Sequence, residues 1–84
     1  MSDNKDMIKK KLNEIFRQVF NQEELQVFDT MAAKDVEGWD SLTNVLLIVA
    51  IERAFNLKFA TGEIIDLRNV GEIVSLIQNK LSES

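Results

Sequence analysis

The sequence predicts an all-α fold: a four-helix bundle of three long helices and one short helix, with a long first connecting loop. Three segments repeat apolar residues at spacings of three and four, the period of a helix with one buried face. A short alternation of apolar residues at positions 57–59 would form an isolated strand with nothing to pair with. The chain also contains no proline, no repeat and no linker-like composition, so we expect one domain spanning residues 1–84.

The first long helix is expected to follow a polar start. Residues 1–6 are expected to fray, with Asp3 or Asn4 as the candidate N-cap. The lysines at positions 9–11 fall largely outside the apolar stripe, and three lysines in an acidic chain are too few for a nucleic-acid or membrane surface. The buried stripe of this helix is expected to be Ile8, Leu12, Ile15, Phe16, Val19 and Phe20.

Residues 21–40 carry no regular period. Because a long loop without structure is unusual in a compact domain, we expect this segment to be pinned to the core, with one helical turn near residues 30–33. Trp39 is interpreted as a large apolar anchor, and cofactor stacking is the alternative. The other expected anchors are Leu25, Val27, Phe28, Met31 and Val36.

The second long helix is expected over residues 41–55, ending at Asn56, which tolerates a left-handed backbone. Asp40 is a good N-cap, and Gly38 allows a sharp turn into the helix. Ser41 then places its hydroxyl at the positive end of the helix dipole, where a phosphate is favoured. A serine at a helix start is, by itself, also an ordinary capping residue.

The last third of the chain predicts a loop and two further helices. Residues 57–59 are expected to form a loop, followed by a short helix over residues 61–66 that Thr61 caps. Asn69 is the expected N-cap of the last helix, and Glu72 completes a capping-box-like arrangement. The buried stripe of that helix is expected to be Val70, Ile73, Val74, Ile77 and Leu81.

The second long helix has two apolar faces. The expected core face consists of Leu47, Ile48, Ile51 and Phe55. A second set lies roughly opposite: Leu42, Val45, Leu46 and Val49. Either the long connection or the short third helix, with Ile64 and Ile65, folds over this second set, or the set is a docking surface for another protein. The pattern alone does not choose between the two.

Composition excludes several classes of function. The chain has 14 acidic and 10 basic residues, a net charge of −4, which argues against nucleic-acid binding. It has no Cys and no His, which removes thiol nucleophiles, disulfides, imidazole bases and the usual zinc ligands. No apolar run reaches transmembrane length and no signal-peptide core follows Met1, and the lack of Cys fits a cytoplasmic protein.

The chain resembles the acyl and peptidyl carrier proteins over nearly its whole length. The resemblance rests on Asp40-Ser41-Leu42 after Gly38, an apolar helix that reaches Glu52 and Phe55, Leu57-Lys58-Phe59, a short acidic helix, and a last helix led by Asn69-Val70. It implies that Ser41, flanked by Asp40 and Leu42, is the attachment site for 4′-phosphopantetheine, placed there from coenzyme A by a phosphopantetheinyl transferase. The arm would supply the thiol that the chain lacks.

On this resemblance the chain is not an enzyme but a free-standing, monomeric carrier. It would hold an acyl or aminoacyl group as a thioester and present it on a tether, which raises local concentration. Its partners would be an acyl- or aminoacyl-loading enzyme and a downstream synthase or transferase, in lipid or secondary-metabolite biosynthesis.

The second helix departs from the commonest fatty-acid carriers, which usually have several acidic residues there. Glu52 is its one carboxylate after the motif, because the other positions hold Thr43, Asn44, Leu46, Arg53 and Ala54. This favours a dedicated carrier in a secondary or modification pathway. It also predicts that partners bind through the apolar set Leu42, Val45, Leu46 and Val49, with little dependence on salt.

Two other classes of protein are alternatives. The first is a small helical adaptor that is never modified and binds a partner through the same apolar set. The second is a hydrolase that uses Asp35, Glu37 and Asp40, but a bundle this small has little room for the concave site that such chemistry needs. A metal site from these carboxylates lacks calcium-loop spacing.

Overall fold

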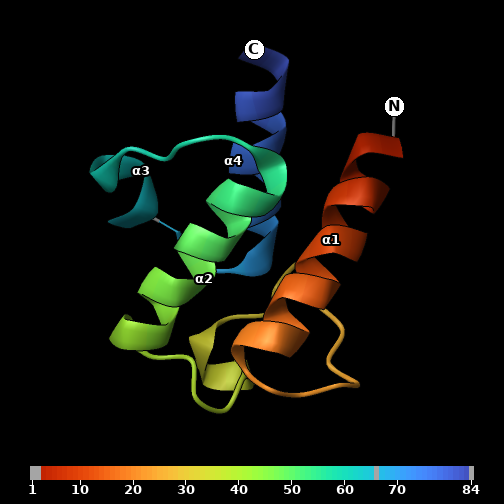
Figure 1. The fold of residues 1–84 in the computed structure, drawn as a ribbon, viewed down its shortest axis with the longest axis vertical. Coiled ribbons are helices and arrows are strands. Elements are labelled where there is room, and N and C mark those ends of the chain that lie inside the picture. The colour runs from red at the N-terminus through yellow and green to blue at the C-terminus, as the bar shows by residue number, and fades with distance from the viewer. Residues whose placement is uncertain (1–2, 66, 84) are drawn as a thin grey trace.

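Four α-helices and one 3-10 turn make up the described chain, residues 3–65 and 67–83 of a computed structural model (Figure 1). The helices are α1 (Asp3–Val19), α2 (Ser41–Phe55), α3 (Thr61–Ile65) and α4 (Val70–Glu83), and the turn η1 (Ala33–Asp35) lies in the long first connection. No strand occurs among these residues. The predicted all-α fold with three long helices and one short helix is therefore confirmed.

Helix α1 begins earlier than the sequence predicts. It already includes Asp3, so residues 3–6 are helical and the expectation that Asp3 or Asn4 precedes the helix as its cap is wrong. Residues 1 and 2 lie outside the described part. Two features favour the early start. Ile8 is fully buried and packs the first turns of the helix against the core, and the negative charge of Asp6 lies near the positive end of the helix dipole.

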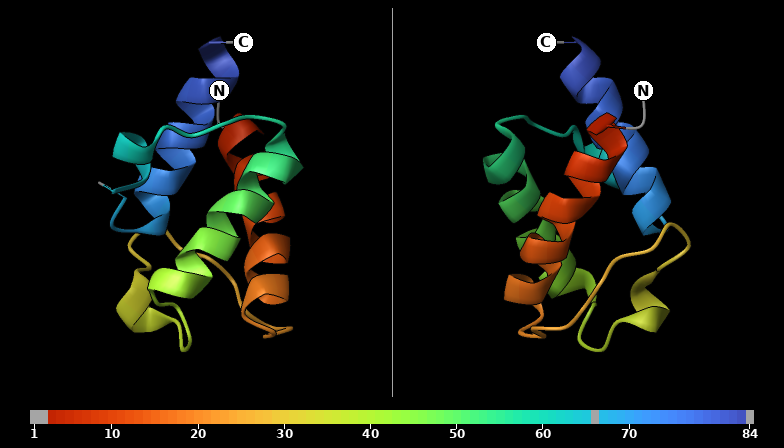
Figure 2. Two further views of the ribbon diagram at one scale, coloured as in Figure 1. Left: turned by 60° about the vertical axis from the view of Figure 1, so that its left-hand side comes forward. Right: turned by 90° about the vertical axis from the view of Figure 1, so that its right-hand side faces the viewer.

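The core lies between α1, α2 and α4, which surround it in both views of Figure 2. Every α2 residue predicted to face the core is buried, and so are the α1 and α4 stripes apart from Val19, Phe20 and Leu81, which are partly buried. Burial of one stripe from each long helix provides the apolar area that holds a bundle of this size together.

The long connection is pinned to the core, but not at every expected residue. Met31 and Val36 are buried, and Leu25 and Val27 are partly buried against the core. Phe28 is 49% exposed, so its assignment as an anchor is wrong. Its side chain is not needed there, because the backbone of this segment is held by hydrogen bonds instead.

Hydrogen bonds fix the path of the connection at two places. Near α1, the Arg17 Nε–H donates to the carbonyl of Leu25 at 2.6 Å, and the Asn13 side chain accepts the N–H of Val27 at 2.7 Å. Near α4, the carbonyls of residues 29 and 31 accept the first N–H groups of that helix, those of residues 71 and 70, at 2.7 and 2.8 Å. These bonds satisfy donors that a helix start leaves free.

The 3-10 turn η1 in the connection is displaced from the expected place of the helical turn. It covers Ala33–Asp35 rather than residues 30–33. The carbonyl of Met31 bonds α4, and the Asp35 carboxylate accepts the N–H of Ala32 at 3.0 Å, so the turn begins after residue 32. Tertiary hydrogen bonds have thus moved the turn along the chain.

Residues 57–59 form a loop, as predicted, with Phe59 buried. The expected cap of α3 is wrong, because Thr61 is already helical and the preceding residue, Ala60, occupies the cap position. Glu63 stabilises this start by accepting the N–H of Ala60 at 2.8 Å, and its carboxylate also pairs with Lys80 at 2.8 Å. The predicted last residue of this helix, Asp66, lies outside the described residues.

Helix α4 has the predicted N-cap. The side-chain oxygen of Asn69 accepts the N–H of Glu72 at 2.9 Å. Glu72 completes the start of the helix differently from a capping box, because its carboxylate accepts the N–H of Arg68 at 2.7 Å rather than that of the cap residue itself. This bond also fixes the backbone of the residue that links α3 to α4.

Candidate functional site

The start of α2 is held by a reciprocal pair of hydrogen bonds. The carboxylate of Asp40 accepts the N–H of Thr43 at 3.0 Å, and the Thr43 hydroxyl accepts the N–H of Asp40 at 2.8 Å. The same hydroxyl donates to the carbonyl of Gly38 at 2.6 Å, and Gly38 has a φ of +91°, which only glycine adopts easily. Asp40 is thus the predicted N-cap. Sequence reasoning missed Thr43, although its position three residues after the cap is the usual capping-box position.

These bonds also determine the charge of Asp40. The N–H of Thr43, and then its hydroxyl, lower the pKa of the Asp40 carboxyl below its ordinary value of 3.8. A carboxylate that is ionised and engaged in capping is a poor proton donor. Asp35 is similarly engaged in η1. Among the described residues no group of three or more Asp or Glu side chains could hold a metal ion.

Ser41 is exposed and is the first residue of α2. Because Asp40 caps the helix, the hydroxyl of Ser41 is not needed for that purpose, and no hydrogen bond engages it within the described part of the chain. The hydroxyl therefore lies at the N-terminus of a long helix, where the dipole and the free N–H groups favour an anionic substituent.

A hollow of about 510 Å³ adjoins Ser41. It lies where the start of α2, the long connection and the segment from α3 to α4 come together, and its lining is part apolar and part polar. The lining residues are Ala33, Trp39, Asp40, Ser41, Asn44, Ile64, Leu67 and Arg68. Arg68 could not be linked to Ser41 from the sequence, because only the packing of α3 beside α2 brings the two into one hollow.

Trp39 anchors the connection, as predicted. Its ring meets Phe16 edge-on, with centroids 5.3 Å apart and planes at 83°, and lies 6.0 Å from the ring of Phe20. The indole N–H donates to the side-chain oxygen of Asn44 at 3.0 Å. These contacts fix Trp39, and with it the backbone just before Asp40, to both α1 and α2.

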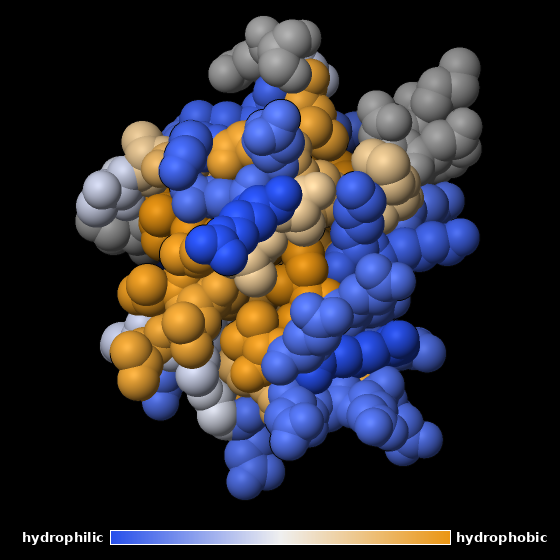
Figure 3. Space-filling view, viewed as in Figure 1, coloured by the Kyte–Doolittle hydropathy of each residue, from blue (hydrophilic) through white to orange (hydrophobic). Residues whose placement is uncertain are grey.

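The second apolar set of α2 is exposed to solvent. Exposed fractions are 72% for Leu42, 59% for Val45, 54% for Leu46 and 42% for Val49, and Figure 3 shows an apolar area over this part of the molecule. Neither the connection nor α3 covers these residues, so the alternative in which they are buried is wrong. We call this set the α2 stripe. Exposed apolar residues gathered on one helix face often mark a binding surface.

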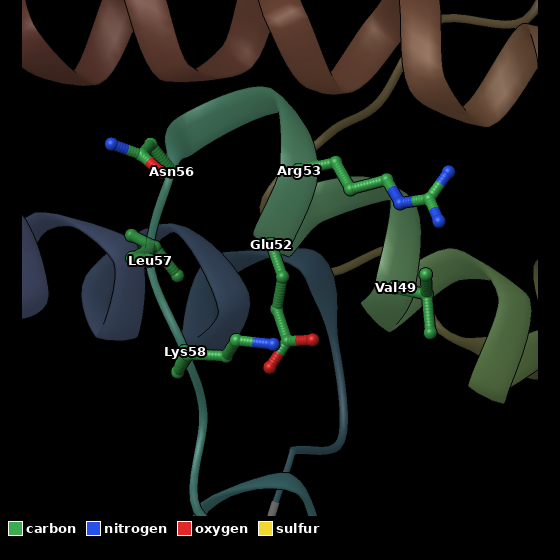
Figure 4. Close-up of a pocket in the computed structure, with 6 residues that line it drawn as sticks. All are labelled: Val49, Glu52, Arg53, Asn56, Leu57 and Lys58. Atoms are coloured by element: carbon green, nitrogen blue, oxygen red, sulfur yellow. The ribbon is translucent and has the colours of Figure 1, made fainter.

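A second hollow, of about 430 Å³, lies at the far end of the α2 stripe (Figure 4). Glu52 lines it, and its carboxylate accepts the N–H of Phe59 at 2.8 Å, which fixes the loop after α2. Arg53 and Lys58 are exposed beside it, and Figure 4 shows the Arg53 side chain extending away from Glu52. Glu52, the one carboxylate of α2, therefore makes a structural hydrogen bond.

Comparisons with known proteins identify the family. The family model described as a phosphopantetheine attachment site matches residues 10–77. The solution structure of a holo acyl carrier protein from Geobacter metallireducens is similar to this chain, with 39% sequence identity and a TM-score of 0.82, over 88% of this chain and 85% of that one. A comparison with curated proteins gave no match.

No helix among the described residues is long and apolar enough to cross a membrane. The chain has no cysteine, and the terminal thiol of a phosphopantetheine arm supplies the group that forms thioesters. Carrier domains of this kind are not catalytic, and they work with transferase and synthase partners. The chain therefore belongs to the phosphopantetheine attachment-site family, and it is a carrier protein that bears a covalently attached 4′-phosphopantetheine.

Proposed function

We propose that Ser41 is the residue that carries the arm, and that the chain holds an acyl or aminoacyl group on it as a thioester. The observation that carries this proposal is the exposed Ser41 hydroxyl at the N-terminus of α2, beside a cap that Asp40 and Thr43 already satisfy. Modification of this hydroxyl leaves the hydrogen bonds of the helix start intact. The helix dipole favours the negative charge of the phosphodiester.

The loading reaction needs a separate enzyme. A phosphopantetheinyl transferase would join the Ser41 oxygen to the phosphorus nearer the pantetheine of coenzyme A, break the pyrophosphate bond, and release adenosine 3′,5′-bisphosphate and the hydroxyl proton. The chain has no histidine and engages Asp40 in capping, so the base that takes this proton belongs to the transferase. We infer that the chain itself catalyses no step.

The test is a comparison of two serine variants. Ser41→Ala and Ser75→Ala, each incubated with coenzyme A and a broad-specificity transferase, are analysed by intact mass. Both serines are exposed, but Ser75 lies within α4, away from any helix start. The Ser75 variant should gain the mass of the arm and the Ser41 variant should not, with equal helical circular dichroism. Mass gain by Ser41→Ala would place the arm elsewhere.

We propose that the α2 stripe is where partner enzymes dock. Support comes from its exposure, from its start one residue after Ser41, and from the engagement of Glu52 in the fold. The partners would be an acyl- or aminoacyl-loading enzyme and a downstream synthase or transferase. Because apolar contacts are weakly screened, their affinity should change little with salt.

We further propose that residues 1–84 form one domain that acts as a monomer in the cytoplasm. Support for the single domain is the shared core of α1, α2 and α4. The lack of cysteine fits a reducing compartment. Sedimentation or light scattering of the loaded protein tests the oligomeric state, and a concentration-dependent dimer would contradict it.

A further inference from the structure

Arg68 is the one cationic residue among those that line the hollow beside Ser41, and all of the lining residues are described. The backbone of Arg68 is held in place, because its N–H donates to the Glu72 carboxylate at 2.7 Å. Its side chain is exposed, and no described carboxylate lies within ion-pair distance of its guanidinium. Arg68, whose guanidinium carries a permanent positive charge and several hydrogen-bond donors, thus lines the same hollow as Ser41.

The charge balance of the hollow changes when the arm is attached. Asp40 also lines it and stays ionised, since Thr43 lowers the pKa of its carboxyl. A phosphodiester on Ser41 adds a second negative charge beside the first. Arg68 is the one lining residue that can offset this charge, and a planar guanidinium can donate two parallel hydrogen bonds to phosphate oxygens.

The apolar lining matches the next part of the arm. In 4′-phosphopantetheine the phosphate is joined through a methylene group to a carbon that bears two methyl groups. Trp39, Ile64 and Leu67 supply apolar surface to the same hollow, and each is partly buried, so part of each side chain remains available for contact. A volume of about 510 Å³ accommodates a segment of this size.

We propose that Arg68 pairs with the phosphodiester on Ser41 and that this hollow holds the first segment of the arm. The proposal rests on attachment at Ser41. Arg68 is then a positioning residue: it holds the root of the arm between α2 and the segment that links α3 to α4. The distal, thiol-bearing part of the arm remains free to reach partner enzymes.

The experiment uses the loaded protein, so no partner enzyme has to be known. Wild type, Arg68→Gln, Arg68→Lys and the control Lys34→Gln are each loaded from coenzyme A, and loading is verified by intact mass. Lys34 is an exposed cation of η1 that does not line the hollow, so its variant removes the same charge nearby. Phosphorus NMR of the arm and proton–nitrogen spectra of Arg68 and Trp39 are recorded before and after loading.

Loading should shift the Arg68 Nε–H and Trp39 indole resonances of wild type. Raising salt from about 0.1 M to about 1 M shortens the Debye length from about 10 Å to about 3 Å. The phosphorus resonances of wild type and Lys34→Gln should then move toward that of Arg68→Gln, which should respond little. The phosphorus resonance of Arg68→Lys should lie between those of wild type and Arg68→Gln, because lysine keeps the charge but loses the paired hydrogen-bond geometry.

Identical phosphorus shifts and salt responses in loaded wild type and Arg68→Gln would overturn the proposal. If Arg68→Gln fails to fold, wild type alone decides, and an Arg68 Nε–H resonance that does not move on loading overturns it. Both results leave attachment at Ser41 standing, because the arm is present. Arm mass on Ser41→Ala removes the basis for both proposals.

Discussion

Two neighbouring leucines of α2 offer the sharpest test of the docking proposal. Leu46 lies in the middle of the α2 stripe and is 54% exposed, whereas Leu47 is fully buried in the core. The two differ in environment but share residue type and helix. Leu46→Glu should therefore leave the fold intact and impair docking, while Leu47→Ala should reduce stability.

The expected magnitudes follow from burial. Truncation of a fully buried leucine costs about 3–5 kcal/mol, because a cavity adds to the lost transfer free energy. Leu46 buries less than half of its surface, and a glutamate there keeps its methylenes on the helix, so its cost should stay below about 1 kcal/mol. A chain of 84 residues has a total stability of roughly 4–13 kcal/mol.

Urea unfolding followed by circular dichroism measures both costs. With a slope of about 1 kcal/mol/M for a small protein, Leu47→Ala should lower the midpoint by about 3–5 M and Leu46→Glu by less than about 1 M. Transfer by the cognate loading enzyme should fall about tenfold or more for Leu46→Glu, which corresponds to about 1.4 kcal/mol of docking free energy.

Two results would refute this reasoning. If Leu46→Glu lowers the midpoint as much as Leu47→Ala does, the α2 stripe is part of the core. If transfer is unchanged by Leu46→Glu but collapses as salt rises, charges rather than the α2 stripe hold the partner.

Three further predictions concern the support of the site. Trp39→Ala should destabilise by about 2–3 kcal/mol, since it removes two aromatic contacts and a hydrogen bond; a loss within about 0.5 kcal/mol by circular dichroism would contradict its role as an anchor. The folded-state pKa of Asp40 is lowered, so its charged form contributes stability above pH 3.8 that is lost as pH falls through the lowered value. Asp40→Asn can still cap the helix, so in melting curves it should lose less stability at acid pH than wild type does. An equal loss in the variant and in wild type would argue against this contribution of Asp40. Gly71→Ala should cost about 1–3 kcal/mol, because a Cβ would lie 3.0 Å from the carbonyl oxygen of Asp29, whereas Gly62→Ala, with open space, should stabilise by up to about 1 kcal/mol. Equal effects of the two glycine variants would contradict the close approach at α4.

Helix periodicity was sufficient to predict the long helices and their core faces. Spacings of three and four place Leu47, Ile48 and Ile51 on one side of α2 wherever that helix packs, and all three are buried. Asp40 and Asn69 were also predictable as caps, because capping depends on side chains within three residues of the helix start. Local chemistry likewise singled out the exposed hydroxyl of Ser41.

Only the tertiary structure shows which apolar set of α2 is exposed, how the long connection runs and where Arg68 lies. Periodicity identifies the core face of α2 and a second apolar set opposite it, but whether that second set is covered depends on the path of the long connection. That path is set by backbone carbonyls of Asp29 and Met31 that bond the start of α4, and backbone groups leave no pattern in the sequence. The exposure of Phe28 and the placement of η1 follow from the same bonds. Arg68 and Ser41 line one hollow for a similar reason, since residues so far apart in the chain are brought to one site by helix packing and not by local spacing.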